Sequence, residues 1–171
     1  MNDVSQHLRK CRACGGRLSL TFCDLGTMAV ANAYLSKEAD LMAEPVYPLR
    51  VKVCEHCKLV QLDTVVDAAS IFSEYAYYSS ASATWLAHAA QFSQAMTERL
   101  LLNQDSLVVE VASNDGYLLR NFVQAGIPCQ GIEPAANIAA QAIANGIPTE
   151  VVFLNVDTAR ALVEKRGRHA D

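Results

Sequence analysis

Residues 107–119 read LVVEVASNDGYLL, and this stretch decides the fold. Its first five residues are apolar apart from Glu110, which is typical of a buried strand. A short polar turn follows and closes at Gly116, and the apolar residues beyond it recur at helical spacing. Strand, tight turn and helix in this order form the unit at which doubly wound folds bind nucleotides. We therefore expect a ligand-binding turn at residues 112–116.

Two further strand–helix units follow this first one. The second strand is predicted at about residues 129–133 and the third at residues 151–154, each with a helical pattern after it. Residues that favour helix ends follow the three predicted helices: Gly126, Asn145-Gly146 and Gly167. Strands that alternate with helices at this spacing predict the α/β class, here a partial doubly wound, Rossmann-like sheet over residues 105–171.

The turn after the first strand lacks the glycines that a dinucleotide needs. Only Gly116 is present where G-x-G-x-x-G would place three, which argues against an NAD-dependent oxidoreductase. S-adenosylmethionine (SAM) carries no phosphate and does not need them. Glu133, at the end of the second strand, can accept hydrogen bonds from both ribose hydroxyls of an adenosine group. Together with Glu110 it predicts a SAM site; the alternative is an acid that only complements a helix dipole.

Two C-x-x-C pairs occupy the first third of the chain, namely Cys11-Arg-Ala-Cys14 and Cys54-Glu-His-Cys57. Each pair can direct two thiolates at one metal ion, and Gly15 after the first pair lets the backbone fold back. Four thiolates complete a closed tetrahedral site, which predicts structural Zn²⁺.

Other roles for the cysteines fit the sequence less well than zinc binding. A thioredoxin-like redox pair would begin a helix in a βαβ unit, and neither pair does. His56 could replace a thiolate, but it lies inside a C-x-x-C. Cys23 and Cys129 have no partner at metal spacing, so we expect them to be small buried residues.

Residues 71–104 join the cysteine region to the α/β region. They begin with an aromatic, serine-rich stretch and continue as a predicted helix. The apolar face of that helix consists of Trp85, Ala89, Phe92, Met96 and Leu100. The chain therefore divides into residues 1–70, 71–104 and 105–171.

The composition excludes several classes of protein. The formal net charge is −4 and 19% of the residues are charged. No Lys/Arg cluster predicts a nucleic-acid surface, and no apolar run approaches the roughly 20 residues that span a bilayer. The polar start has no secretory signal, so we expect a cytoplasmic protein with reduced thiols.

Beyond these features, the chain resembles the SAM-dependent sugar-nucleotide C-methyltransferases that make branched deoxysugars. The resemblance runs over residues 8–171 and is specific because many short motifs occur in order. The motifs are Cys11-x-x-Cys14-Gly15, Ala31-Asn32-x-Tyr34-Leu35, Tyr47-Pro48-Leu49, Cys54-x-x-Cys57-x-Leu59-Val60-Gln61-Leu62, Tyr75-Ala76-Tyr77 with Ser80, Ser82 and His88, Val109-Glu110-Val111-Ala112-Ser113-Asn114-Asp115-Gly116, and Gly131-Ile132-Glu133-Pro134-Ala135-x-Asn137-x-Ala139.

The resemblance implies an N-terminal zinc module followed by a SAM-binding α/β domain of the class I methyltransferase type. It implies that a 4-keto, nucleotide-linked deoxysugar is methylated through an enolate. The cofactor-binding residues that we predict lie in the two strand-end turns: Glu110, Ala112, Ser113, Asn114, Asp115, Gly116, Tyr117, Glu133, Pro134 and Asn137.

Three residues are candidates for catalysis, namely Tyr75, Tyr77 and His88. The alternatives are that the tyrosines pack an interface and that the histidine is structural. The family's main base belongs to a Tyr-His-Glu-His motif that this sequence lacks, and it is expected beyond Asp171. We therefore expect these 171 residues alone to be an inactive N-terminal fragment.

The predicted sheet has a further consequence. In the methyltransferase strand order the first strand is central, so three strands alone leave it as an apolar edge, through which the chain is expected to self-associate. A competing interpretation from another class is a zinc-ribbon interaction module with a vestigial nucleotide-binding half-domain.

Overall fold

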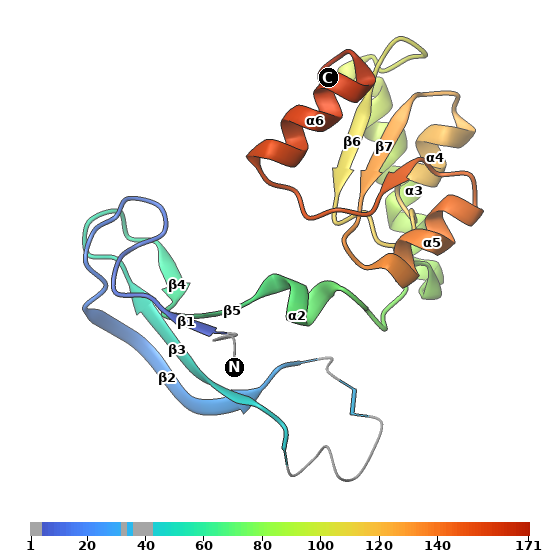
Figure 1. Cartoon of the computed structure of the whole chain (residues 1–171). Coiled ribbons are helices and arrows are strands. Elements are labelled where there is room, and N and C mark those ends of the chain that lie inside the picture. Colours follow the sequence, from blue (N-terminus) through green and yellow to red (C-terminus); the bar gives the residue numbers. More distant parts are fainter. Residues whose placement is uncertain (1–4, 32–33, 36–42) are drawn as a thin grey trace. The chain divides into compact units, whose positions relative to one another are not determined.

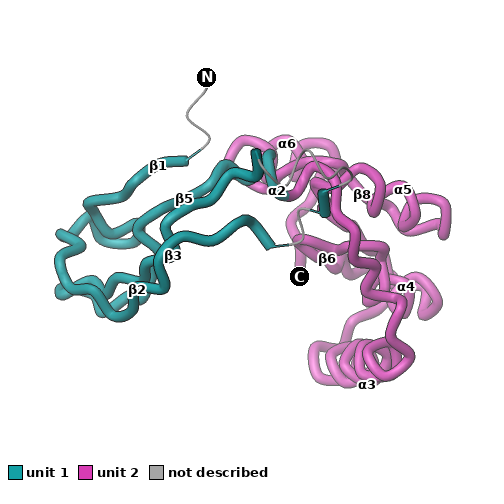
Figure 2. Tube along the Cα trace, turned by 90° about the horizontal axis from the view of Figure 1, so that it is seen from below, with its two compact units in different colours: residues 1–71 teal, residues 72–171 magenta. Residues whose placement is uncertain are grey.

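The computed structural model describes residues 5–31, 34–35 and 43–171. Asn32, which belongs to one of the quoted motifs, lies outside the described residues. The chain forms two compact units, residues 1–71 and residues 72–171 (Figures 1 and 2). Each unit is described by itself.

Unit 1 consists of two small antiparallel sheets (Figure 1). One pairs β1 (Ser5–His7) with β5 (Thr64–Val66). The other has the order β2-β3-β4, with β2 at Leu20–Ala29, β3 at Val46–Val53 and β4 at Val60–Leu62. The β-like runs expected at residues 49–53 and 59–62 therefore fall in β3 and β4. A short helix, α2 (Ala68–Phe72), follows β5.

A buried ion pair connects the two sheets of unit 1. Asp63, between β4 and β5, is fully buried, and the Arg50 Nε of β3 donates to its Oδ2 at 2.7 Å. The Leu8 N–H, just after β1, donates to the Asp63 carbonyl at 2.6 Å. The buried carboxylate thus binds β3 and the Asp63 main chain binds the residue after β1, so Asp63 ties both sheets to the turn between β4 and β5.

Unit 2 begins with the aromatic stretch, which contains the 3₁₀ turn η1 (Ser79–Ala81). The long helix α3 (Ala83–Leu100) follows. Strands and helices then alternate as β6 (Val108–Val111), α4 (Leu119–Gln124), β7 (Cys129–Ile132), α5 (Ala136–Ala144), β8 (Thr149–Glu150) and α6 (Val156–Arg166). The three predicted helices are present and end where expected, before Gly126, Asn145 and Gly167.

The sheet of unit 2 is parallel and has the order β6-β7-β8. The fold class is therefore as predicted, a mixed α/β chain with a partial Rossmann-like sheet. Within the described residues β6 is an edge strand, and its Val109 and Val111 are 37% and 53% exposed. Beside the start of β6, the Asp171 N–H donates to the Leu107 carbonyl at 3.2 Å.

The third strand was predicted too late in the chain. It covers Thr149–Glu150 and not residues 151–154. Its last ladder bond runs from the Glu133 N–H to the Glu150 carbonyl at 3.0 Å. Alternate residues of a parallel strand face the same neighbour, so Ala135 would donate next, but its N–H donates to the Glu133 side chain and α5 begins at Ala136. Val151 and Leu154, both 44% exposed, therefore lie outside the sheet.

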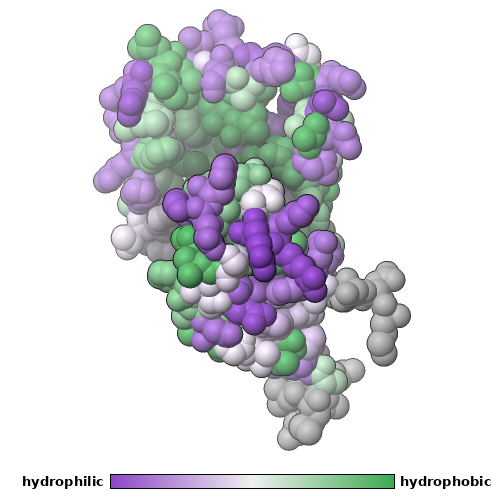
Figure 3. All heavy atoms as spheres, turned by 90° about the vertical axis from the view of Figure 1, so that its left-hand side faces the viewer, coloured by the Kyte–Doolittle hydropathy of each residue, from purple (hydrophilic) through white to green (hydrophobic). Residues whose placement is uncertain are grey.

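The core of unit 2 lies between the sheet and the helices α4 and α5. Its buried residues are Leu119, Phe122, Ile127, Cys129, Ala142 and Ile147. The apolar face predicted for α3 is only partly covered. Ala89 is buried, whereas Trp85, Phe92 and Leu100 are 43–58% exposed. Apolar surface is visible among polar side chains in Figure 3. No helix among the described residues is long and apolar enough to cross a bilayer.

Candidate metal centre and cofactor turn

The two C-x-x-C pairs form knuckles of the same geometry. In the first, the Gly15 N–H donates to the Cys11 carbonyl at 2.9 Å. In the second, the Lys58 N–H donates to the Cys54 carbonyl, also at 2.9 Å. Gly15 and Lys58 have φ angles of 72° and 63°, so each chain reverses through a left-handed residue directly after its second cysteine. The reversal turns the two thiols of each pair toward the other pair.

All four predicted ligands come together. Their sulfur atoms lie within 4.8 Å of one another, with 3.6 Å between Cys11 and Cys57 and 3.5 Å between Cys14 and Cys54. Zinc–sulfur bonds of about 2.3 Å in a tetrahedron place the sulfurs about 3.8 Å apart. The all-sulfur donor set and its spacing therefore fit one Zn²⁺.

The thiols are electrostatically coupled. The Cys14 N–H, the Gln61 side chain and the Ala13 N–H together lower the pKa of Cys11 to about 6. The N–H groups of Cys57 and His56 lower the pKa of Cys54. For Cys57, the Leu59 N–H lowers the pKa, but the other three cysteines and burial outweigh it and raise the pKa to about 12. Without a cation, four adjacent thiolates repel one another, and a divalent ion removes this repulsion.

Gln61 supports the metal ligands from outside. This residue of β4 is 4% exposed, and its Nε2 lies 3.1 Å from the Cys11 sulfur. Its Oε1 accepts from the Arg12 N–H at 3.1 Å. The amide thus fixes one ligand and the backbone of its knuckle. Gln61 occurs in a quoted motif, but the spacing of the cysteines gave no sign of its role.

The cofactor turn predicted after β6 is tightly wound. Ala112, Asn114 and Gly116 have positive φ angles of 56°, 51° and 78°. A Cβ on Gly116 would lie 2.3 Å from the Ile147 Cδ1, so glycine is required there by both backbone and space. The turn follows the carboxyl end of β6, where α/β folds bind ligands; Ala112 is exposed there and residues 113–116 are buried.

Glu133 lies at the end of β7 and organises this region. It is 6% exposed, and its two oxygens accept from the N–H groups of Asn114 and Ala135, each at 2.9 Å. Each carboxylate oxygen has a further lone pair, so Glu133 can accept additional hydrogen bonds. The acid therefore joins the turn after β6 to the start of α5.

Three buried oxygens of β6 and of the turn after it have no hydrogen-bond partner among the described residues: Glu110 Oε2, Ser113 Oγ and Asp115 Oδ1. Burial, Glu133 and Asp115 together raise the pKa of Glu110 to about 8. Unpartnered buried oxygens are costly, and they fit a ligand that brings donors or positive charge. SAM carries ribose hydroxyls, an ammonium and a sulfonium, so the residues present fit this cofactor.

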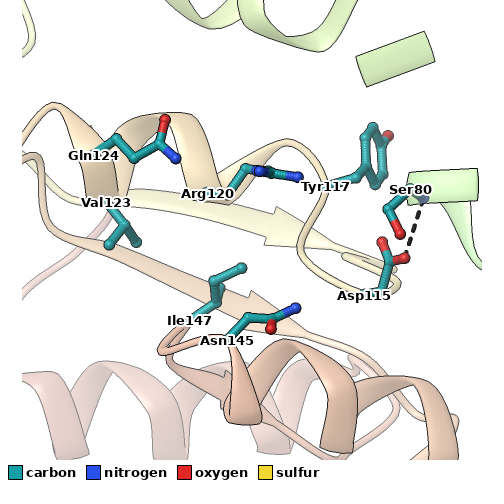
Figure 4. A pocket seen from close by; sticks show the side chains of 8 residues that line it. All are labelled: Ser80, Asp115, Tyr117, Arg120, Val123, Gln124, Asn145 and Ile147. Atoms are coloured by element: carbon teal, nitrogen blue, oxygen red, sulfur yellow. Dashed lines mark hydrogen bonds between the residues drawn. The ribbon is translucent and has the colours of Figure 1, made fainter. Parts of the chain in front are cut away.

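A pocket of about 400 Å³ borders the turn on the side of α4 (Figure 4). Two of the predicted cofactor residues line it, Asp115 and Tyr117, whereas Glu110 and Glu133 do not. Its other lining residues are Ser80, Arg120, Val123, Gln124, Asn145 and Ile147. The Ser80 N–H donates to the Asp115 Oδ2 at 3.1 Å, which ties η1 to the turn.

The three candidate catalytic residues lie in unit 2 at different exposures. Tyr75 is half-buried, with its ring 6.2 Å from that of Phe72, and Tyr77 is exposed. His88 is exposed on α3 and stacks on Trp85 with ring centroids 5.3 Å apart. Trp85 in turn lies 5.9 Å from the Tyr117 ring beside the cofactor turn. Two predicted cofactor residues remain: Pro134 follows Glu133 and is half-buried, and Asn137 is exposed in the first turn of α5.

These features define a class of protein, in which a four-cysteine zinc module precedes a Rossmann-like unit. Residues 11–72 match a methyltransferase-associated family described as a putative zinc binding domain. The chain is 30% identical over 167 residues, 98% of its length, to the C-methyltransferase NovU of Streptomyces niveus. It spans 40% of that relative's length. Over nearly its whole length the chain is therefore similar to part of a C-methyltransferase, and its residues 11–72 are similar to a zinc-binding domain, as the sequence predicted.

Proposed function

We propose that this chain provides the zinc module and the SAM-binding turn of a C-methyltransferase that acts on a 4-keto, nucleotide-linked deoxysugar. The observation that carries the proposal is the junction of Glu133 with the turn at residues 112–116, at the ends of two neighbouring parallel strands. The similarity to NovU, which is named a C-methyltransferase, supports the reaction class.

Each part of the proposed site has a separate task. Glu133 would accept the ribose hydroxyls, and the unpartnered Glu110 oxygen is available to accept a hydrogen bond from the bound cofactor. When bound, SAM supplies an electrophilic methyl group. The zinc ion, held by four cysteines, has no open position and would be structural.

The tyrosine stretch would serve the sugar. An enolate forms when a base removes the proton next to the ketone, and hydroxyl donors stabilise its oxygen. Tyr75 or Tyr77 could provide that hydroxyl, and His88 could bind the SAM carboxylate or the substrate. The base belongs to the Tyr-His-Glu-His motif of the family, which these 171 residues do not contain, so we expect no methyl transfer by this chain alone.

Calorimetry of the zinc-loaded chain with SAM tests the proposal. We expect binding that Glu133→Gln weakens. The matched control is Glu164→Gln, which changes an exposed acid of α6. Equal affinity of both variants would contradict the assignment of Glu133. Tighter binding of NAD than of SAM would contradict the cofactor class.

One observation favours a second candidate, the zinc-ribbon interaction module. The strand β2 carries exposed apolar side chains, with Phe22 72% and Leu25 60% exposed. Such side chains are typical of protein-binding surfaces. A zinc-loaded chain that binds no SAM would favour this alternative.

A further inference from the structure

Two asparagines of unit 2 bind the main chain of the tyrosine stretch with both ends of their side-chain amides. The Asn137 Nδ2 donates to the Tyr75 carbonyl at 2.7 Å, and the Tyr75 N–H donates to the Asn137 Oδ1 at 3.1 Å. An amide that exchanges two bonds with one residue imitates a neighbouring strand, so it fixes that residue's position and its orientation.

Asn114 makes the same kind of contact at the other end of the stretch. Its Oδ1 accepts from the Ser79 N–H at 2.8 Å, and its Nδ2 donates to the Tyr77 carbonyl at 3.1 Å. Asn114 is 8% exposed, so these bonds are shielded from water. Residues 75–79 are therefore held at both ends by side chains, one from the turn after β6 and one from the start of α5.

Glu133 connects the two asparagines. One of its oxygens accepts from the Asn114 N–H, and the other accepts from the Ala135 N–H at the start of α5, two residues before Asn137. A further hydrogen bond supports the Tyr75 end of the stretch, since the Ala136 N–H donates to the Ser73 carbonyl at 3.3 Å. The proposed ribose acid thus lies between the two residues that hold the tyrosine stretch.

We propose that Asn114 and Asn137 are positioning residues, whose amides fix Tyr75 and Tyr77 relative to the turn at residues 112–116. Both had been predicted from the sequence to bind the cofactor. The geometry assigns their side chains to the protein's own main chain instead. The role of the positioned tyrosines rests on the proposed function. The hydrogen bonds that the two asparagines make to residues 75–79 do not depend on it.

Amide hydrogen exchange, measured by NMR on the zinc-loaded 171-residue chain, tests the hold directly. The reporters are the Tyr75 and Ser79 N–H groups, which donate to the two asparagine oxygens. The reference is the Gly131 N–H, which donates to the Pro148 carbonyl inside the sheet. Asn137→Ala should speed exchange at Tyr75 about tenfold and leave Gly131 unchanged.

Conservative and control variants separate positioning from general loss of structure. Asn137→Asp keeps the acceptor oxygen and should preserve most protection of the Tyr75 N–H. Asn145→Ala, at the other end of α5, should change neither reporter. At the other position Asn114→Gly suits the positive φ and removes only the side chain, so it should expose the Ser79 N–H. In 3-fluorotyrosine protein, the ¹⁹F resonances of Tyr75 and Tyr77 should shift in both deletion variants.

The outcomes are distinct from those of the proposed function. Faster exchange at Tyr75 or Ser79 with unchanged sheet protection supports the proposal, whether or not the chain binds SAM. Unchanged exchange and unchanged ¹⁹F resonances in both Asn137→Ala and Asn114→Gly would overturn it. Weaker SAM binding in Asn137→Ala without faster exchange would make that residue a cofactor ligand and would also overturn it.

Discussion

Gly15 and Lys58 occupy the same position in the two zinc knuckles, and both are left-handed, with φ angles of 72° and 63°. Each donates its N–H to the carbonyl of the first cysteine of its pair at 2.9 Å. Glycine adopts this conformation without cost, whereas a residue with a Cβ is strained by about 1–2 kcal/mol. The second knuckle therefore holds strain that the first does not.

Lys58→Gly should stabilise the zinc module by about 1 kcal/mol, because it removes the strain and keeps the N–H that the turn uses. Hydrogen exchange of the Cys54 N–H, which donates to the Leu59 carbonyl, would measure this. Lys58→Ala keeps the Cβ and should bring no gain. An equal gain in both variants would attribute the effect to the lysine side chain.

Removal of one ligand should abolish the metal site. The purified chain should contain about one zinc, and Cys54→Ser should lose it because three thiolates do not close the tetrahedron. Metal analysis and thiol titration would measure both. We expect residues 8–62 to loosen while the βα units stay folded. Cys23→Ser, a change at a cysteine outside the cluster, should retain zinc. Zinc retained by Cys54→Ser would contradict the assignment.

Gln61→Leu should weaken zinc binding by about 10–100-fold, the usual effect of losing an outer-shell partner of a metal ligand. The variant keeps a buried side chain of similar size but loses the bonds to Cys11 and to the Arg12 N–H. Competition with a chelator would measure the affinity. Gln130→Leu, a buried glutamine of unit 2, is the matched control and should leave it unchanged.

Local sequence patterns predicted those parts of the metal centre and of the cofactor turn that depend on residues close together in the sequence. The doubled C-x-x-C spacing identified the metal ligands, because each knuckle is a self-contained turn. Strand, turn and helix around Gly116 were predictable for the same reason. The third strand was misplaced because an apolar run does not reveal that the Ala135 N–H, the next donor of β7's segment, binds the Glu133 side chain and leaves the ladder.

Contacts between distant residues could not be predicted in this way. Gln61 reaches a sulfur 50 residues away, and Asn137 binds Tyr75 across 62 residues. Spacing along the chain carries no signal for such pairs, since each depends on how whole elements pack. The exposure of Trp85 and Phe92 on α3 is a further case, because helical periodicity predicts a face but not what covers it.

Unit 2 should lose stability as the pH rises from about 4 to 8. Burial, Glu133 and Asp115 raise the pKa of Glu110 to about 8, whereas a glutamate in the unfolded chain titrates near about 4.3. Between these values the unfolded chain has released a proton that the folded chain still holds. Glu110 therefore contributes a slope of at most about 1.4 kcal/mol per pH unit, and this contribution is lost as the pH increases.

Glu110→Gln should remove that slope. The chain contains one tryptophan, Trp85 on α3, so its fluorescence during urea unfolding reports on unit 2. The free energy of unfolding measured at pH 5–8 should fall less steeply in the variant than in the natural chain. Glu164→Gln, at an exposed acid of α6, should keep the natural slope. Parallel curves for the natural chain and Glu110→Gln would contradict the prediction.

Glu133→Gln should remove discrimination for the ribose hydroxyls. The carboxylate has lone pairs left after accepting from Asn114 and Ala135, and those are the acceptors that a 2′,3′-diol needs. In the variant, the amide NH₂ also faces one of the two N–H groups, so some loss of stability is expected alongside the loss of affinity. Affinity for SAM alone therefore does not isolate the ribose contact.

Two nucleosides that differ only in the ribose hydroxyls isolate the ribose contact of Glu133. The natural chain should bind adenosine at least about tenfold more tightly than 2′,3′-dideoxyadenosine, because a buried charged acceptor that loses its donors costs about 1.5–3 kcal/mol. Glu133→Gln should bind both nucleosides with nearly equal affinity, whatever its own stability. Competition against labelled SAM would measure all four affinities. If the variant still prefers adenosine by the natural ratio, the diol lies elsewhere on the turn and Glu133 has a purely structural role.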